Sequence, residues 1–143
     1  MIEVIILAFL LTLLCTAYLD WQYRLVPKIV WIPIILIGAP ISLWEYWAIA
    51  TWDQIIPMLI LIIALYILGV KKVIGGADAL GMIFLIAFLH EYGLITILLS
   101  CMFCMPFILY SYLMYRKDWT KYGIPFMIPL SMGYIITVWY FLT

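Results

Sequence analysis

The sequence predicts an all-α polytopic membrane protein, a compact bundle of six transmembrane helices with both chain ends outside the cytoplasm. Of its 143 residues, 70% are hydrophobic and 10% are charged, whereas a soluble domain is about 45–50% apolar and about 25% charged. Long apolar runs recur with short connections between them, and every Lys and Arg falls in alternate connections. The length accommodates a single domain, residues 1–143.

Each apolar run approaches the length of about 20 residues that a membrane-spanning helix needs. We expect spans at residues 2–19, 29–47, 55–70, 74–89, 92–115 and 124–142. The shorter runs are expected to tilt or to thin the bilayer locally. Glu3, with no basic residue before it, indicates that the first run is a retained span rather than a secretory signal.

The connections predict the orientation of the spans. Basic residues follow the first, third and fifth runs: Arg24, Lys28, Lys71, Lys72, Arg116, Lys117 and Lys121. The opposite connections carry Glu45, Asp53, His90 and Glu91 and no Lys or Arg. Because basic connections are retained in the cytoplasm, this pattern places both termini outside, with His90 and Glu91 in a solvated outer turn. The zero net charge predicts no nucleic-acid partner.

Two aspartates lie at the predicted cytoplasmic ends of spans, Asp20 closing the first and Asp78 opening the fourth. Two carboxylates within about 3 Å share a proton. One then acts as a general base on water while the other protonates a substrate carbonyl oxygen, which is aspartic-protease chemistry and needs no metal or cofactor. Gly75 and Gly76 would let the first helix or an extended substrate come close to Asp78.

The two aspartates also fit structural and transport roles. Asp78 suits the positive end of a helix dipole, and Asp20 could pair with Arg24 one turn later. A small proton-coupled membrane transporter, with the two aspartates as a proton relay, is the alternative from another class. Transporters place such groups near the midplane between internal repeats, and neither feature is evident here. A non-catalytic assembly subunit is a third alternative.

The cysteines and the single histidine do not predict a metal site. A zinc site needs more ligands than Cys101 and Cys104 supply, and His90 lies near the other face. Buried thiols behave as small apolar side chains. We expect that role for Cys15, Cys101 and Cys104.

Three motifs include the two aspartates and the beginning of the last span. The stretch GGAD, from Gly75 to Asp78, has the pattern GxGD. The stretch DWQYRLVPKIVWIP contains Asp20, Pro27 and Pro33. The stretch GIPFMIPLSMG contains Pro125, Phe126, Pro129 and Gly133. In type and register, the three motifs together resemble those of the type IV prepilin peptidases and their archaeal preflagellin relatives, which are GxGD intramembrane aspartic proteases.

The resemblance implies a membrane aspartic endopeptidase with Asp20 and Asp78 as catalytic residues. It implies cleavage of the short leader (class III signal peptide) from pilin-like or archaellin-like precursors at the cytoplasmic boundary of the plasma membrane. The insert with two Cys-x-x-Cys pairs that accompanies N-methylation in bacterial members is missing, so no methylation is expected.

Two positions depart from the pattern of that family, and three cationic side chains lie near the predicted site. Lys28 stands where the family usually has Asn or Asp, and Leu80 stands where a lysine is common. Arg24, Lys71 and Lys72 are candidate contacts for the leader, although control of topology also explains them.

Overall fold

The computed structural model describes residues 2–23, 26–115 and 126–142. Every regular element in these ranges is helical, as the sequence predicts. In chain order the elements are α1 (Ile2–Tyr23), the 3-10 helix η1 (Lys28–Trp31), α2 (Ile32–Ser42), the π-helical turn η2 (Leu43–Trp47), α3 (Trp52–Val70), α4 (Gly76–Tyr115) and α6 (Met127–Leu142).

Four of the described helical segments are long and apolar enough to cross a membrane, and α6 is a shorter apolar helix. The four are Glu3–Tyr23, Lys28–Trp47, Trp52–Val70 and Gly76–Met114. The prediction of a multi-pass helical membrane protein is therefore confirmed. The first helix continues past the predicted end at residue 19 as far as Tyr23, so Asp20 lies in its last turn instead of closing it.

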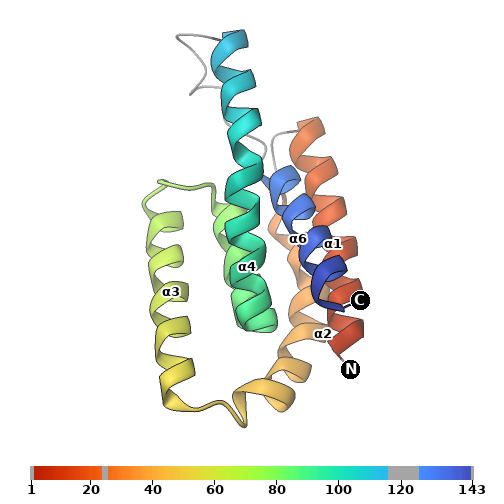
Figure 1. Cartoon of the computed structure of the whole chain (residues 1–143), viewed down its shortest axis with the longest axis vertical. Coiled ribbons are helices and arrows are strands. Elements are labelled where there is room, and N and C mark those ends of the chain that lie inside the picture. The colour runs from red at the N-terminus through yellow and green to blue at the C-terminus, as the bar shows by residue number, and fades with distance from the viewer. Residues whose placement is uncertain (1, 24–25, 116–125, 143) are drawn as a thin grey trace.

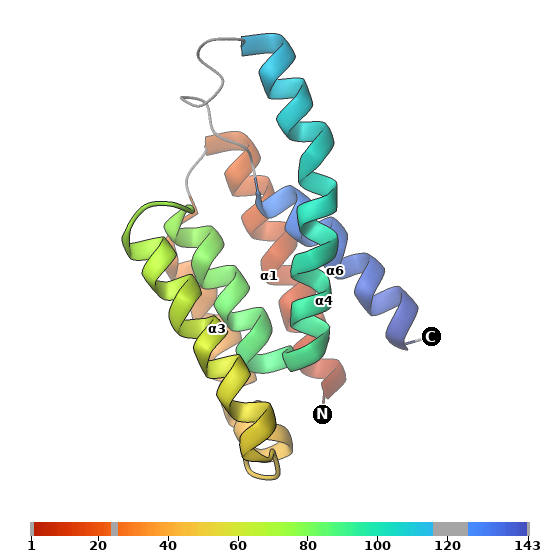
Figure 2. The same ribbon diagram turned by 60° about the vertical axis from the view of Figure 1, so that its left-hand side comes forward.

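The fourth and fifth predicted spans form the two parts of α4, which are separated by a break at His90. The backbone of His90 has φ 52° and ψ −115°, outside the helical range. Figure 2 shows that the chain turns back at this point, so that residues 76–89 and 91–115 run side by side. A Cβ on Gly93 would clash with the backbone carbonyl group of Leu85, which explains why a glycine follows this reversal.

The second predicted span is helical throughout but irregular. Its first turn is the 3-10 helix η1, and the following helix α2 has Pro33 in its first turn. Pro33 sits where a helix tolerates a missing N–H. Pro40 lies inside α2, just before the π-helical turn η2.

The core lies between α1, α2, α6 and the first half of α4. It consists of buried apolar side chains, namely Ile5, Phe9, Leu13, Trp31, Ile34, Leu85, Leu89, Met127, Leu130 and Tyr134. Phe9 of α1 joins the helices here, because its ring contacts those of Phe88 and Tyr134. By contrast, α3 has no buried residue and packs chiefly on α4.

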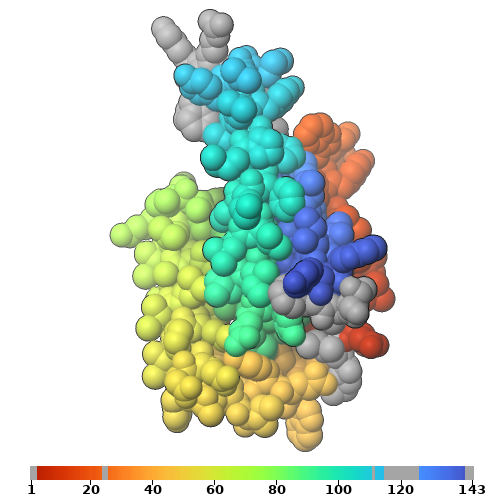
Figure 3. Space-filling view, viewed as in Figure 1, coloured from red at the N-terminus to blue at the C-terminus, as the bar shows by residue number. Residues whose placement is uncertain are grey.

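The bundle has two ends, and the candidate site lies at one of them. Figure 1 shows that α1 ends, and α4 and α6 begin, at the upper end of the bundle, while the two chain ends point the other way. The α3 helix flanks the bundle on one side. The final turns of α4 stand clear of the other helices in the space-filling view of Figure 3.

Candidate active site

Asp20 is held by the beginning of α6. Its carboxylate oxygen Oδ2 accepts a hydrogen bond from the backbone N–H of Met127, at 3.3 Å, across 107 residues of sequence. Met127 is the first residue of α6, where backbone N–H groups lack partners within the helix. The half-buried Asp20 thus receives both a hydrogen bond and the positive end of a helix dipole, and both stabilise negative charge on it.

Asp78 lies in the first turn of α4, and its side chain is half-buried. Its carboxylate folds back over Gly75: a Cβ at that position would clash with Oδ2 and lie 3.1 Å from Cγ of Asp78. Gly75 also accepts the first helical hydrogen bond, from the N–H of Ala79 at 2.9 Å. Only a glycine leaves room for this carboxylate position without displacing it.

The adjacent Gly76 has a different environment. A Cβ there would meet no atom within 4 Å. The sequence assigned both glycines the same role, that of allowing close approach to Asp78. The structure separates them, because Gly75 is crowded by the carboxylate of Asp78 whereas Gly76 faces open space.

The two aspartates lie near each other in the fold. Asp78 lies within range of the charge of Asp20, across the boundary between α1 and α4. Their catalytic role is not tested by this geometry and stays a prediction. The sequence predicted only an apolar role for Cys104. This residue is buried in the second half of α4, within range of the charge of Asp78.

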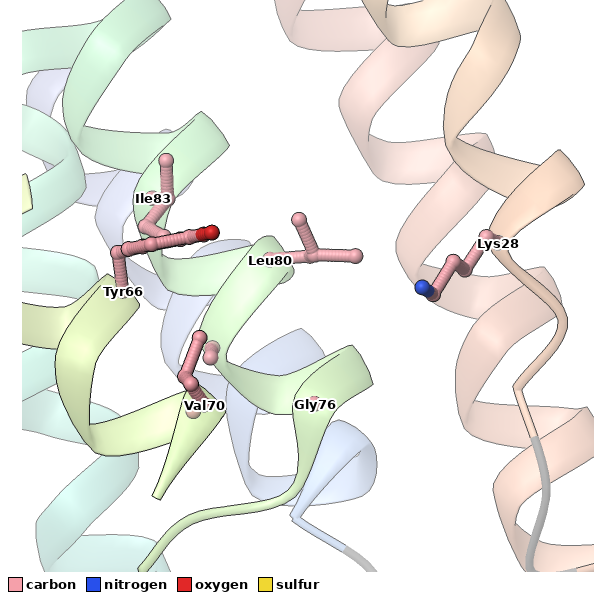
Figure 4. A pocket seen from close by; sticks show the side chains of 8 residues that line it. Lys28, Tyr66, Val70, Gly76, Leu80 and Ile83 are labelled. Atoms are coloured by element: carbon pink, nitrogen blue, oxygen red, sulfur yellow. The ribbon is translucent and has the colours of Figure 1, made fainter. Parts of the chain in front are cut away.

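A cavity of about 250 Å³ lies at the same end of the bundle as the aspartates. Its lining comes from η1, α3 and the start of α4, and comprises Lys28, Tyr66, Gly69, Val70, Gly76, Ala79, Leu80 and Ile83. Figure 4 shows the side chain of Lys28 reaching from one wall toward Leu80, which points from the facing wall. Neither aspartate lines this cavity, because its α4 residues share a helix face that is turned away from Asp78.

The C-terminal motif positions α6 rather than contributing a reactive group. Pro129 and Gly133 are buried in α6. A Cβ on Gly133 would lie 2.5 Å from Oγ of Ser100 and 2.8 Å from the carbonyl oxygen of Thr96. This close contact with α4 fixes α6 so that its first N–H reaches Asp20. Phe126 packs on the core, and Pro125 lies outside the described residues.

The remaining predicted residues lie around this end of the molecule. Pro27 directly precedes η1 and is exposed. Lys71 and Lys72 are exposed in the turn between α3 and α4, and Lys72 has φ 57°. Arg24 lies outside the described residues.

Two expectations away from the aspartates are wrong. His90 is not in a solvated turn, because its ring stacks on that of Tyr46, with centroids 3.3 Å apart and planes at 17°. Cys15 and Cys101 are exposed, and only Cys104 is buried. The outward position of the first two follows from the bilayer, which allows apolar side chains to face lipid.

In the described part of the chain, no group of three or more His, Cys, Asp or Glu residues is placed to hold a metal ion.

Comparison with known proteins identifies the family. The family model for type IV leader peptidases matches residues 7–109. This range includes both aspartates and the cavity, and it covers more than half of the chain. No curated protein and no solved structure shows a significant match. The chain therefore belongs to the type IV leader peptidase family, whose members are aspartic-type peptidases that remove the leaders of prepilins.

Proposed function

We propose that this protein is the membrane endopeptidase that removes the leader from a pilin-like or archaellin-like precursor, with Asp20 and Asp78 as its catalytic pair. One observation carries this proposal: two half-buried carboxyl groups from distant parts of the chain lie within range of each other's charge at one end of the bundle. Aspartic-type hydrolysis needs such a pair of carboxyl groups.

The surroundings of the two carboxylates favour different roles for them. The N–H of Met127 and the dipole of α6 stabilise negative charge on Asp20, so Asp20 is the general base. Asp78 carries the shared proton and is the general acid. The water oxygen adds to the scissile carbonyl carbon while Asp20 takes a proton from water and Asp78 protonates the carbonyl oxygen. As the C–N bond breaks, Asp20 returns its proton to the amine and Asp78 regains one from the intermediate.

The distribution of charge supports a cytoplasmic site. If the two halves of α4 each span the bilayer, the chain crosses it six times and both termini lie outside. The described cations Lys28, Lys71 and Lys72 are then cytoplasmic, as basic connections are, and so are the aspartates. The substrate leader lies on that side, where Lys71, Lys72 and Arg24 influence its docking through charge.

A cleavage assay tests the catalytic pair. The purified protein in detergent is incubated with a synthetic precursor that has a short charged leader and a hydrophobic helix. Asp20→Asn and Asp78→Asn should each lower kcat at least a hundredfold, because acid–base catalysis by one group contributes about 10²–10⁴-fold. Circular dichroism should show retained helix in both variants.

Asp53→Asn is the matched control, because Asp53 is an exposed aspartate in the first turn of α3. It should cleave the precursor at the wild-type rate. Cleavage at the wild-type rate by either Asp20→Asn or Asp78→Asn would disprove the catalytic assignment. Proton-driven solute flux in vesicles without cleavage would favour a transporter instead.

A further inference from the structure

The last helix contacts both helices that carry the aspartates. At the start of α6, Met127 donates its backbone N–H to Asp20 of α1. Two neighbouring residues near the middle of α6 then face different helices. A Cβ on Gly133 would clash with the backbone of α4, whereas Tyr134 contacts α1. Because Asp78 belongs to α4, α6 links the helix of one aspartate to the helix of the other.

Tyr134 is fixed to α1 by both its ring and its hydroxyl group. The side chain is 1% exposed, and the centroid of its ring lies 6.0 Å from that of Phe9. The hydroxyl group donates a hydrogen bond to the backbone carbonyl oxygen of Ile6, at 2.9 Å, across 128 residues of sequence. A buried tyrosine hydroxyl needs such a partner, because the bilayer interior has no water to replace it.

The two hydrogen bonds from α6 reach well-separated parts of α1. Met127 and Tyr134 lie on the same face of α6, about 10.5 Å apart along its axis, because seven residues make about two helical turns. Their partners are further apart, since Ile6 precedes Asp20 by 14 residues, or about 21 Å along α1. Figure 2 shows the far end of α6 diverging from α1, and the long side chain of Tyr134 reaches across. The two contacts together oppose both sliding and tilting of α6 against α1.

We propose that Tyr134 is a positioning residue for catalysis. Its hydrogen bond to Ile6 sets the tilt of α6 and so keeps the N–H of Met127 within reach of Asp20. This inference rests on the proposed peptidase function. Apolar packing alone positions α6 weakly, because lipid is as apolar as the packed side chains and leaves no hydrophobic drive between helices. A hydrogen bond has a preferred distance and direction, so it fixes a position as well as adding stability.

Tyr134→Phe tests this role by removing the hydroxyl group while keeping the ring. The carbonyl group of Ile6 retains its hydrogen bond within α1, so the helix content should be unchanged. In the cleavage assay kcat should fall about threefold with KM unchanged, since a hydrogen bond shifts the population of correctly positioned molecules by no more than its own free energy. Tyr18→Phe is the matched control, because it removes the same group from an exposed tyrosine of α1, and it should cleave at the wild-type rate.

A double-mutant cycle separates positioning from a structural role. Tyr134→Phe is combined with Met127→Ala, which keeps the N–H that Asp20 accepts, and with Met127→Pro, which deletes it. The loss of kcat should persist beside Met127→Ala and disappear beside Met127→Pro, because no N–H is left to position. A purely structural contribution would lower kcat by the same factor in both backgrounds. Each rate is normalised to the fraction of folded protein.

Hydrogen–deuterium exchange, followed by mass spectrometry, supplies a measurement that needs no substrate. Peptides that contain Met127 should exchange about threefold faster in Tyr134→Phe than in wild type, and Tyr18→Phe should match wild type. Unchanged exchange in Tyr134→Phe, or equal losses of kcat beside Met127→Ala and Met127→Pro, would overturn the role of Tyr134 and leave the peptidase function intact. Failure of wild type to cleave any precursor would remove the peptidase function and this catalytic role together, whereas the exchange would still show whether Tyr134 holds α6 in place.

Discussion

Each end of the bundle has two acidic side chains and a cavity, but the surroundings of the acidic side chains differ. The aspartate end holds Asp20, Asp78 and a cavity of about 250 Å³ that neither of them lines. At the other end, which we name the His90 end, Asp53 and Glu91 line a cavity of about 260 Å³ together with His90. Asp20 and Asp78 are half-buried, whereas Asp53 and Glu91 are exposed.

The difference between the ends lies in what fixes the polar groups. Asp20 is fixed by the N–H of Met127, and Asp78 lies against Gly75 and within the field of Asp20. At the His90 end the fixed group is a backbone carbonyl. Ala87 lies where the helical pattern is about to break, and its carbonyl oxygen accepts hydrogen bonds from Ser42 and Trp47, at 2.9 and 3.0 Å. We infer that the aspartate end is organised for catalysis, whereas the His90 end stabilises the reversal of α4.

The largest expected effect at the aspartate end comes from adding a methyl group at Gly75. Gly75→Ala should lower kcat about a hundredfold, because the new Cβ displaces the carboxylate of Asp78 and a misplacement of about 1 Å can cost 10²-fold. Stability should change little, since the displaced group is the free end of a side chain. The measurement is the cleavage rate of the synthetic precursor alongside thermal unfolding.

The adjacent glycine supplies the control for this substitution. Gly76→Ala adds the same methyl group where no atom lies within 4 Å, so kcat should stay within about threefold of wild type. Equal losses of kcat in both variants would mean that helix propensity, and not the position of Asp78, explains the effect.

A smaller effect should follow from removing the hydrogen-bond donor to Asp20. Met127→Pro deletes the N–H at the first position of α6, where proline fits a helix. Met127→Ala keeps the N–H and removes the same buried side chain. Relative to Met127→Ala, Met127→Pro should lower kcat about tenfold, the equivalent of one hydrogen bond to a charged group.

The comparison of these two variants isolates one bond, because both lose the core packing of Met127. Their unfolding free energies should therefore be similar, and both should fall below that of wild type by about 2–5 kcal/mol. If Met127→Pro and Met127→Ala cleaved the precursor at the same rate, the beginning of α6 would have no part in preparing Asp20.

The sequence predicted the helices and the two aspartates because hydropathy and motif spacing are local properties. The contacts that distinguish the ends are not local. The N–H of Met127 and Asp20 are separated by 107 residues, and no periodicity relates them. The unequal roles of Gly75 and Gly76 depend on where one side chain folds, and adjacent identical residues carry no signal for that.

The error at His90 has a related cause. Its polar neighbour Glu91 is exposed, which fits the expected solvated turn between two apolar runs. The ring of His90, however, lies against Tyr46 and Trp47, which come from η2 and reach it only because the chain reverses. A lone histidine beside a glutamate predicts a surface turn unless the aromatic residues of another helix are known to cover it.

The smallest effect is expected at the His90 end and concerns stability alone. His90 is a non-glycine residue with φ 52°, a conformation that costs about 1–3 kcal/mol for a side-chain-bearing residue. His90→Gly should therefore have a higher unfolding free energy than His90→Ala, by about 1–2 kcal/mol, since both lose the stacking on Tyr46 and only glycine relieves the strain. Equilibrium unfolding in mixed micelles measures this difference. Both variants should cleave the precursor at the wild-type rate, and a loss of kcat in either would show that the two ends are coupled and that the reversal at His90 also holds the aspartates in place.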